Sequence, residues 1–194
     1  MGEEKKRLPV GLENFEQIIK DNYYYVDKTG LISELLRNGG MVNLFTRPRR
    51  FGKTLNMSML EHFFSIEREQ SIFDGFEISK DTKLCEAYMG KYPVISISLK
   101  GINAATYEDA FDFAVQIIKN VAGKMQFLLE SGNLSDFDKS EYKKLLDSRM
   151  SKAVFCSGLK TLSELLEKHY ETKVVLLIDE YDVPLAKAFE NGYY

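Results

Sequence analysis

The feature that most constrains this chain is a short arginine-rich segment between an apolar run and an amphipathic helix. Its eight residues are Arg47-Pro48-Arg49-Arg50-Phe51-Gly52-Lys53-Thr54. The apolar run, residues 41–46, has the length of a strand, and the helix is predicted from Lys53 to about residue 67. A strand, a loop ending in Gly-Lys-Thr and a helix are the pattern of a phosphate-binding loop, the Walker A motif. We therefore predict that this segment binds the phosphates of a nucleotide.

The segment departs from the usual phosphate loop at its first position. The usual pattern begins with glycine, but Arg47 stands there, and Pro48 both lacks an N–H donor and disfavours helical dihedral angles at Arg47. Gly52 provides the freedom that the turn before the lysine requires. The loop should therefore present fewer backbone donors at its start, and the charge of the arginines can compensate. Which of Arg47, Arg49 and Arg50 contacts the γ-phosphate stays open.

The residues of the loop have distinct predicted roles. Backbone amides of a phosphate loop point at the anion, and the positive end of the following helix adds to the attraction. We expect Lys53 to reach the β- and γ-phosphates and take part in catalysis, and Thr54 to place its hydroxyl on Mg²⁺. The predicted nucleotide-binding set comprises Arg49, Arg50, Phe51, Gly52, Lys53, Thr54 and Leu55.

A second segment, near the end of the chain, supplies the acids that such a site needs, as a Walker B motif does. The apolar residues 174–178 run directly into Asp179 and Glu180. A continuous apolar strand is typical of a sheet covered on both faces, and ligands gather at the carboxyl ends of such strands. We predict that Asp179 holds Mg²⁺ and that Glu180 orients and deprotonates the attacking water. Tyr181 and Asp182 are equally compatible with supporting this site and with a simple loop.

Hydrophobic periodicity predicts alternating strands and helices. Helices are expected at residues 14–21, 31–37, 53–67, 107–129 and 159–170, and strands at 41–46, 92–99 and 174–178, with a β-prone segment at 23–26. The polar residues 136–149 are compatible with a lid, a short helix or a mobile connection. Strands that alternate with helices imply an α/β fold, a three-layer α/β/α sheet of the P-loop NTPase class that is mostly parallel.

Composition and charge narrow the class of protein. The 194 residues carry a formal net charge of −3, with 44% hydrophobic and 28% charged residues, which is typical of one soluble globular domain. No global basic charge indicates nucleic-acid binding. The two cysteines, Cys85 and Cys156, lack metal-ligand spacing, and no apolar stretch is long enough to cross a membrane. We therefore expect a cytoplasmic protein with reduced thiols and no membrane partner.

Other residues that can carry chemistry favour structural roles. His62 and His169 are expected at the surface or in packing rather than in catalysis, because neither stands in a motif. The tyrosines at residues 23–25 are more typical of packing than of stacking on a nucleotide base.

Several motifs together resemble the bacterial AAA-ATPase-like family. They are Leu8-Pro9-Val10-Gly11, Phe15, Tyr25-Val26-Asp27-Lys28-Thr29, the loop from Arg47 to Leu55, Tyr92-Pro93-Val94-Ile95, and the segment from Leu177 to Pro184. The resemblance runs from about residue 8 to the end of the chain, and in that family the missing first glycine of the loop is normal. It implies a P-loop core with an extra central strand and a catalytic glutamate, which hydrolyses ATP with Mg²⁺.

The resemblance also implies an organisation and partners. Within one domain, residues 8–40 would form an N-terminal extension and residues 41–194 a partial ATPase core. Family members usually continue into further strands and a PD-(D/E)XK nuclease-like domain, so the core is expected to be incomplete at its C-terminal side. Such a protein is compatible with a homo-oligomer, with an arginine donated by a neighbour, and with nucleic-acid contacts through the absent domain.

The resemblance points to a role linked to nucleic-acid, mobile-element or defence processes. It also makes Tyr25, Asp27 and Lys28 candidates for contacts with the nucleotide base, because relatives often place such contacts before the phosphate loop.

Two other functions stay open at this level. The degenerate loop and the absent part of the core are compatible with a module that binds nucleotide and regulates or scaffolds without hydrolysis. The arginine cluster is compatible with an accessory domain that binds nucleic acid for a nuclease. Steeply salt-dependent DNA binding that survives Lys53→Ala would favour this last function.

Overall fold

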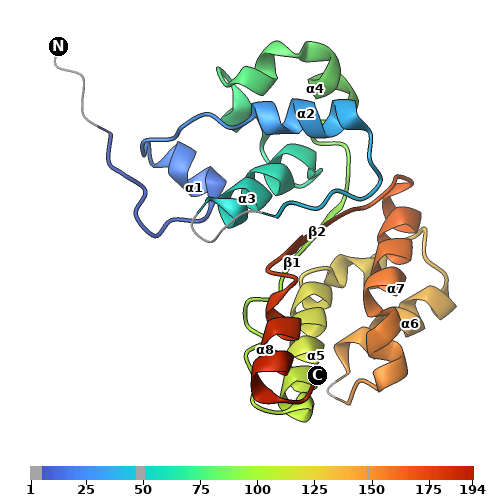
Figure 1. The fold of residues 1–194 in the computed structure, drawn as a ribbon. Helices are drawn as coiled ribbons and strands as arrows, with labels where there is room; N and C mark the ends of the chain where they lie inside the picture. The colour runs from blue at the N-terminus through green and yellow to red at the C-terminus, as the bar shows by residue number, and fades with distance from the viewer. Residues whose placement is uncertain (1–5, 47–50, 148) are drawn as a thin grey trace. The chain divides into compact units, whose positions relative to one another are not determined.

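Figure 1 shows the fold of the computed structural model, which describes residues 6–46, 51–147 and 149–194. The chain divides into two compact units, Met1–Tyr92 and Pro93–Tyr194, and each is described by itself. Helices dominate both units, and the described residues form one sheet of two strands. The protein is therefore a helix-rich α/β fold. The organisation as a single domain stays a prediction.

The first unit is built from short helices around an aromatic core. They are α1 (Phe15–Lys20), α2 (Gly30–Asn38), α3 (Lys53–Phe64), η1 (Gln70–Phe73), η2 (Glu77–Lys80) and α4 (Thr82–Tyr88). Helix α1 begins where the Asn14 side chain accepts a hydrogen bond from the Gln17 N–H. It packs against α3 and η1, where the Phe15 ring stacks on Phe73 at 5.3 Å between centroids. This packing fixes the axis of α3, the helix that follows the predicted phosphate loop.

The second unit packs helices against a small parallel sheet. Its elements are β1 (Val94–Ser98), α5 (Tyr107–Gly123), η3 (Gln126–Glu130), α6 (Asp136–Leu146), α7 (Lys152–Tyr170), β2 (Val175–Asp179) and α8 (Val183–Asn191). The two strands run parallel, in a register that pairs Val94 with Val175 and Ser98 with Asp179. The carboxyl ends of both strands therefore lie at the same edge of the sheet.

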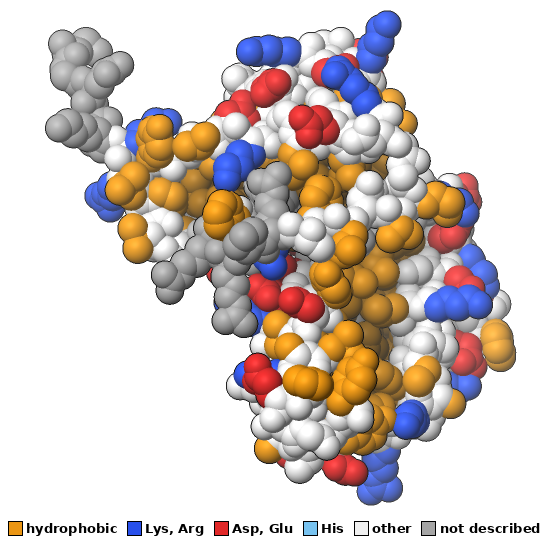
Figure 2. All heavy atoms as spheres, in the orientation of Figure 1, with side chains coloured by type: hydrophobic (Ala, Val, Ile, Leu, Met, Phe, Trp, Pro, Cys, Tyr) orange, Lys and Arg blue, Asp and Glu red, His pale blue; other side chains and the backbone are white. Residues whose placement is uncertain are grey.

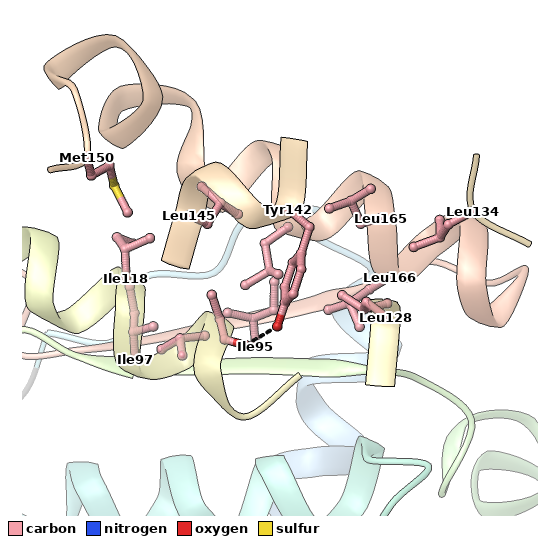
Figure 3. Packing of buried hydrophobic residues seen from close by; sticks show 13 residues of the cluster. Ile95, Ile97, Ile118, Leu128, Leu134, Tyr142, Leu145, Met150, Leu165 and Leu166 are labelled. Atoms are coloured by element: carbon pink, nitrogen blue, oxygen red, sulfur yellow. Dashed lines mark hydrogen bonds between the residues drawn. The ribbon is translucent and has the colours of Figure 1, made fainter. Parts of the chain in front are cut away.

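Figure 3 shows the core of this second unit, where residues of α5, α6 and α7 pack with β1. Ile95 and Ile97 of β1 are buried in this cluster, as are Leu165 and Leu166 of α7. The Tyr142 ring lies at its centre, fully buried, and its hydroxyl donates a hydrogen bond of 2.5 Å to the Ala122 carbonyl. Burial of the phenol raises its pKa to about 12, so the hydroxyl keeps its proton. The cluster supports the sheet beneath the acidic strand end.

Most of the predicted helices and two of the three predicted strands are confirmed. The helices expected at residues 14–21 and 31–37 agree with α1 and α2. Strand β1 lies within its predicted range, and β2 overlaps its predicted range 174–178 but extends to Asp179. The helix expected at 107–129 ends at Gly123 and continues as η3. Residues 136–149, for which a lid, a helix and a mobile connection were open, contain helix α6. Among the described residues, no helix has the length and apolar character needed to cross a membrane.

The strand predicted at residues 41–46 is wrong. These residues form neither strand nor helix, and the Met41 and Val42 side chains are fully exposed. An apolar run becomes a strand only when a neighbouring strand takes up its backbone N–H and C=O groups. No described residue forms a ladder with this run, so the three-layer sheet is not confirmed. The β-prone segment 23–26 likewise forms no strand.

Strand β2 also differs from the prediction that both of its faces are covered. Leu176 is 42% exposed and Ile178 38% exposed, whereas Leu177 and Asp179 are buried. Successive side chains point to opposite faces of a strand, so the two exposed residues share one face. Figure 2 shows hydrophobic side chains that reach the surface of the molecule. An apolar sequence does not reveal how many faces of a strand are covered, because the covering elements come from distant parts of the sequence.

Candidate functional site

The start of helix α3 has the local structure of an anion site. Gly52 adopts a φ of 73°, in the left-handed region, which costs residues with a side chain about 1–2 kcal/mol but not glycine. Among the described residues, no side chain caps this helix, and its first turn holds no acidic residue. The described residues therefore leave the N–H groups of the first turn and the positive helix end without a side-chain acceptor, a local structure that favours an anion.

The predicted nucleotide-binding residues are only partly described. Those that follow the loop lie together at the exposed or half-buried start of α3 and are Phe51, Gly52, Lys53, Thr54 and Leu55. Residues 47–50 lie outside the described part of the chain. The predictions that fall on them are the contacts of Arg49 and Arg50 and the conformation of Arg47 and Pro48.

A tight turn at residues 27–29 anchors a second segment of the first unit. One carboxylate oxygen of Asp27 accepts hydrogen bonds from the Thr29 N–H at 2.8 Å and the Thr29 hydroxyl at 2.7 Å. Its other oxygen accepts one from the Glu77 N–H at 2.8 Å, and the Thr29 hydroxyl accepts one from the Ile78 N–H at 3.1 Å. Partial burial raises the pKa of Asp27, but these donors outweigh it and hold the pKa below its usual range. The turn is thus fastened to η2.

Lys28 stands at the middle of this turn and reaches the start of α3. Its Nζ atom lies 3.6 Å from the position that a β-carbon on Gly52 would occupy. Lys28 is exposed, and no described carboxylate lies within ion-pair distance of its ammonium group. The structure therefore brings a cation from a separate segment to the glycine that begins the predicted phosphate-binding helix.

Tyr25, the first residue of the Tyr-Val-Asp-Lys-Thr motif, packs inside the unit. Its ring meets those of Phe15 and Phe76 edge-on at 5.3 and 5.5 Å, and its hydroxyl donates to the Met59 sulfur at 3.4 Å. Burial raises the pKa of Tyr25 to about 12. The expectation that these tyrosines favour packing is thus confirmed for Tyr25, whose ring is engaged on the protein side.

The acidic pair lies at the end of β2 in the second unit. Asp179 is the last residue of the strand and is buried, and its backbone carbonyl accepts a hydrogen bond from the Leu99 N–H at 3.0 Å. One of its carboxylate oxygens accepts a hydrogen bond from the Glu180 N–H at 2.9 Å. Glu180 has a φ of 53°, an unfavourable value for a residue with a side chain. Strain of this kind is concentrated at functional sites, where the surrounding structure enforces it.

Two of the predicted site residues carry oxygen atoms of the kind that bind magnesium, and each is considered within its own unit. Mg²⁺ in nucleotide sites is held by one or two protein oxygens, by phosphate oxygens and by water. In the described part of the chain, no group of three or more His, Cys, Asp or Glu residues could hold a metal alone. The available ligands are the Thr54 hydroxyl in the first unit and the Asp179 carboxylate in the second, and each is described within its own unit.

Both histidines have structural roles, as the sequence predicted. His62 is 2% exposed, with Nδ1 facing the Ser58 carbonyl at 2.8 Å and Nε2 facing the Glu16 carboxylate at 3.0 Å. His169 contacts the Ser131 hydroxyl through Nδ1 at 2.7 Å. Neither histidine belongs to the predicted phosphate or acidic segments.

Sequence reasoning underrated one residue of this region. It marked Lys28 through the family motif and associated it with the nucleotide base, whereas the structure places its ammonium beside Gly52. The sequence feature that indicates a fixed position for Lys28 is the pair Asp27 and Thr29. Side chains of these types commonly form hydrogen bonds with nearby backbone groups, which fixes the backbone of the residue between them.

A family profile and another protein match this chain. The profile of the AAA-ATPase-like family, described as "Predicted AAA-ATPase", matches residues 9–194. A protein of Azotobacter chroococcum mcd 1, "Uncharacterized protein in vnfD 5'region", is 30% identical over 185 residues, which cover 93% of this chain and 30% of that protein. The chain thus spans about a third of the length of this relative. No solved structure matches the chain.

Proposed function

Because the chain belongs to the AAA-ATPase-like family, we propose that it binds Mg·ATP and hydrolyses it to ADP and phosphate. The start of α3 carries the proposal: a left-handed Gly52 precedes Lys53 and Thr54, and no described side chain caps the helix. A helix end of this kind attracts anions through its free amides and its dipole. The family match supports a nucleotide as the anion.

Each residue of the proposed site has a defined task. Lys53 neutralises charge on the β- and γ-phosphates, and the loop residues Arg49 and Arg50 add positive charge beside them. Thr54 and Asp179 would hold Mg²⁺, and the ion would supply positive charge against the charge that develops during phosphoryl transfer. Glu180 orients a water molecule and takes its proton.

The proposal requires the start of α3 and the end of β2 to serve one nucleotide. Both units would then be parts of a single ATPase domain rather than independent modules. Assembly into a homo-oligomer and contacts with nucleic acid are further parts of the proposal, and only the resemblance described above supports them.

Thermal unfolding with and without Mg·ATP tests nucleotide binding. Ligand at 100 times its dissociation constant should stabilise the folded state by about 2.7 kcal/mol. Lys53→Ala should abolish this gain, whereas Lys83→Ala, which removes an exposed lysine of α4, should retain it. A wild-type protein that responds to no Mg·nucleotide would contradict the proposal.

Glu180→Gln tests hydrolysis separately from binding. Loss of the general base should lower the rate of phosphate release by roughly 10²- to 10⁴-fold and leave Mg·ATP affinity nearly unchanged. If the full-length protein binds Mg·ATP without any turnover, a nucleotide-binding regulatory module is favoured over an ATPase. DNA binding that depends steeply on salt and survives Lys53→Ala would instead favour a nucleic-acid accessory domain.

A further inference from the structure

The amino group of Lys28 occupies an electrostatically unfavourable place. Its Nζ atom lies 3.6 Å from the position of a β-carbon on Gly52, the residue that begins α3. The N-terminus of a helix carries partial positive charge, so a lysine is repelled there and an acidic residue is favoured. The first turn of α3 contains Lys53 and no acidic residue. Two lysines and a positive helix end thus belong to one small region.

This placement of Lys28 is built into the fold. Its neighbours Asp27 and Thr29 both turn toward η2, where they accept hydrogen bonds from the Glu77 and Ile78 N–H groups. Thr29 is completely buried, which fixes the backbone on one side of Lys28. The backbone of the lysine between these two anchored residues has few alternatives. It therefore loses less backbone freedom on meeting a ligand than a lysine on a mobile loop would.

Protein groups in the described residues do not compensate the charge of Lys28. No described carboxylate forms an ion pair with it, although Glu16, Glu69 and Asp81 of the same unit pair with other cations. The fold positions this cation beside a helix end that no described side chain caps, and no described acidic residue pairs with it, so the region is complementary to an external anion. A polyphosphate carries several negative charges, which can engage Lys28, Lys53 and the helix amides together.

We propose that Lys28 is a second phosphate-binding lysine of the site, which contacts the polyphosphate chain of the nucleotide rather than its base. The inference rests on the proposed function and deepens it, because it divides phosphate recognition between two segments of the first unit. Asp27 and Thr29 act as positioning residues that hold the lysine. The sequence analysis expected Lys28 to contact the nucleotide base. The proposal replaces that expectation with a contact to the phosphates, which does not depend on the identity of the base.

Isothermal titration calorimetry of the full chain with two ligands tests this inference. The ligands are ATP and inorganic tripolyphosphate, each with Mg²⁺, because tripolyphosphate offers the phosphate chain without a base. Lys28→Ala should weaken the binding of both about tenfold, the loss expected for one charge-assisted contact. Lys28→Arg should retain most of the affinity, and Lys83→Ala should match wild type for both ligands.

The stability of the ligand-free protein distinguishes this role from a structural one. Lys28→Ala removes an exposed cation from a positive helix end, so its unfolding midpoint should equal or exceed that of wild type. If that variant does not fold, Lys28→Gln keeps the length of the side chain and takes its place in both titrations.

Different failures of these titrations have different meanings. Unchanged affinity of Lys28→Ala for both ligands, with wild type binding ATP, would overturn this inference and leave the proposed function intact. A loss confined to ATP, with tripolyphosphate unaffected, would also overturn it and return Lys28 to the base. If wild type binds neither ligand, the proposed function fails and this inference fails with it.

Discussion

At the scale of single residues, Thr29 shows how one hydroxyl connects a motif to the core of the first unit. It is completely buried, donates to the Asp27 carboxylate at 2.7 Å and accepts from the Ile78 N–H at 3.1 Å. A buried N–H group that loses its acceptor keeps the full cost of leaving water. The threonine of the Tyr-Val-Asp-Lys-Thr motif therefore stabilises the fold, and the lysine before it is free for a ligand.

We expect Thr29→Val, which keeps the shape of the side chain, to lower the free energy of unfolding by about 1–3 kcal/mol, because the Ile78 N–H is left unsatisfied. Urea denaturation measures the loss. Thr29→Ser retains the hydroxyl and serves as the control, with a smaller change. Equal stability of Thr29→Val and wild type would show that the hydroxyl is not needed there.

A second residue-scale feature is the cluster of charges around Glu16. Its carboxylate accepts a hydrogen bond from the Lys20 ammonium at 2.7 Å and lies 3.0 Å from His62 Nε2. Lys20 first, and then His62, lower the pKa of Glu16 to about 2 from the ordinary 4.5. Because the folded-state pKa lies below the unfolded one, the stability that Glu16 contributes is full above pH 4.5 and disappears as the pH falls through about 2.

Glu16→Gln should therefore reduce the free energy of unfolding at neutral pH. Between pH 4.5 and 2, the free energy of unfolding of the variant should depend less on pH than that of wild type. The difference in unfolding free energy between wild type and variant should shrink across this window and vanish near its lower end. Chemical denaturation at several pH values measures it. Glu86→Gln, on the exposed face of α4, serves as the control and should change stability by less than about 0.5 kcal/mol at neutral pH. A constant difference for Glu16→Gln would contradict the lowered pKa.

The sequence was most informative about single residues with strong local rules. Gly52 was expected to adopt an unusual conformation before the lysine, and its φ of 73° agrees. Asn14 as a helix start and Gly39 as a helix end follow from the same kind of local chemistry. The position of the Lys28 ammonium could not be predicted in this way, because it depends on where η2 and α3 lie relative to the turn.

At the scale of elements, α6 shows why polar segments are difficult to predict. Its sequence, residues 136–146, is rich in acidic and lysine residues, so a lid and a mobile connection were as compatible as a helix. Two features decide the outcome: a capping box between Ser135 and Asp138, and burial of Tyr142 and Leu145. The Lys168 ammonium of α7 pairs with the Asp138 carboxylate and lowers its pKa, with help from Ser135. The helix is stabilised mainly by the packing of these buried residues, which is not evident from the polar composition of the segment.

Ser135→Ala removes one half of this capping box. We expect it to lower the free energy of unfolding by about 1 kcal/mol, the usual cost of losing an N-terminal cap. Ser140→Ala, at an exposed position within α6, should change stability by less than about 0.5 kcal/mol. Thermal and urea unfolding of the pair measure both values. If Ser140→Ala lowered the free energy of unfolding as much as Ser135→Ala, the cap would have no special role in stability.

The run at residues 41–46 illustrates the opposite error. Its apolar composition favours a strand, and this preference is a property of the segment itself. A strand also needs a pairing partner, which another part of the molecule must supply. Strands β1 and β2 were predicted correctly since each finds the other, in a register from Val94 and Val175 onward. Periodicity therefore identifies candidate strands, and only tertiary structure decides which of them pair.

At the scale of the whole molecule, the proposed ATPase joins residues that belong to two units. The phosphate-binding residues lie at the start of α3, in the unit Met1–Tyr92, and the acidic residues lie at the end of β2, in the unit Pro93–Tyr194. Family membership, which spans both units, supports a shared function. In the proposed function one set of residues would hold the phosphates and the other would activate water, so both would be needed for hydrolysis.

A double-mutant cycle on Mg·ATP affinity, built from Thr54→Ala and Asp179→Asn, tests whether these residues share one ligand. If both hold the same Mg²⁺, their effects should be non-additive, with a coupling energy of about 0.5–3 kcal/mol. Thr54→Ala combined with Asp112→Asn, an exposed acid of α5, should be additive. Strictly additive losses for Thr54 and Asp179, equal to those of the control pair, would contradict a shared nucleotide site.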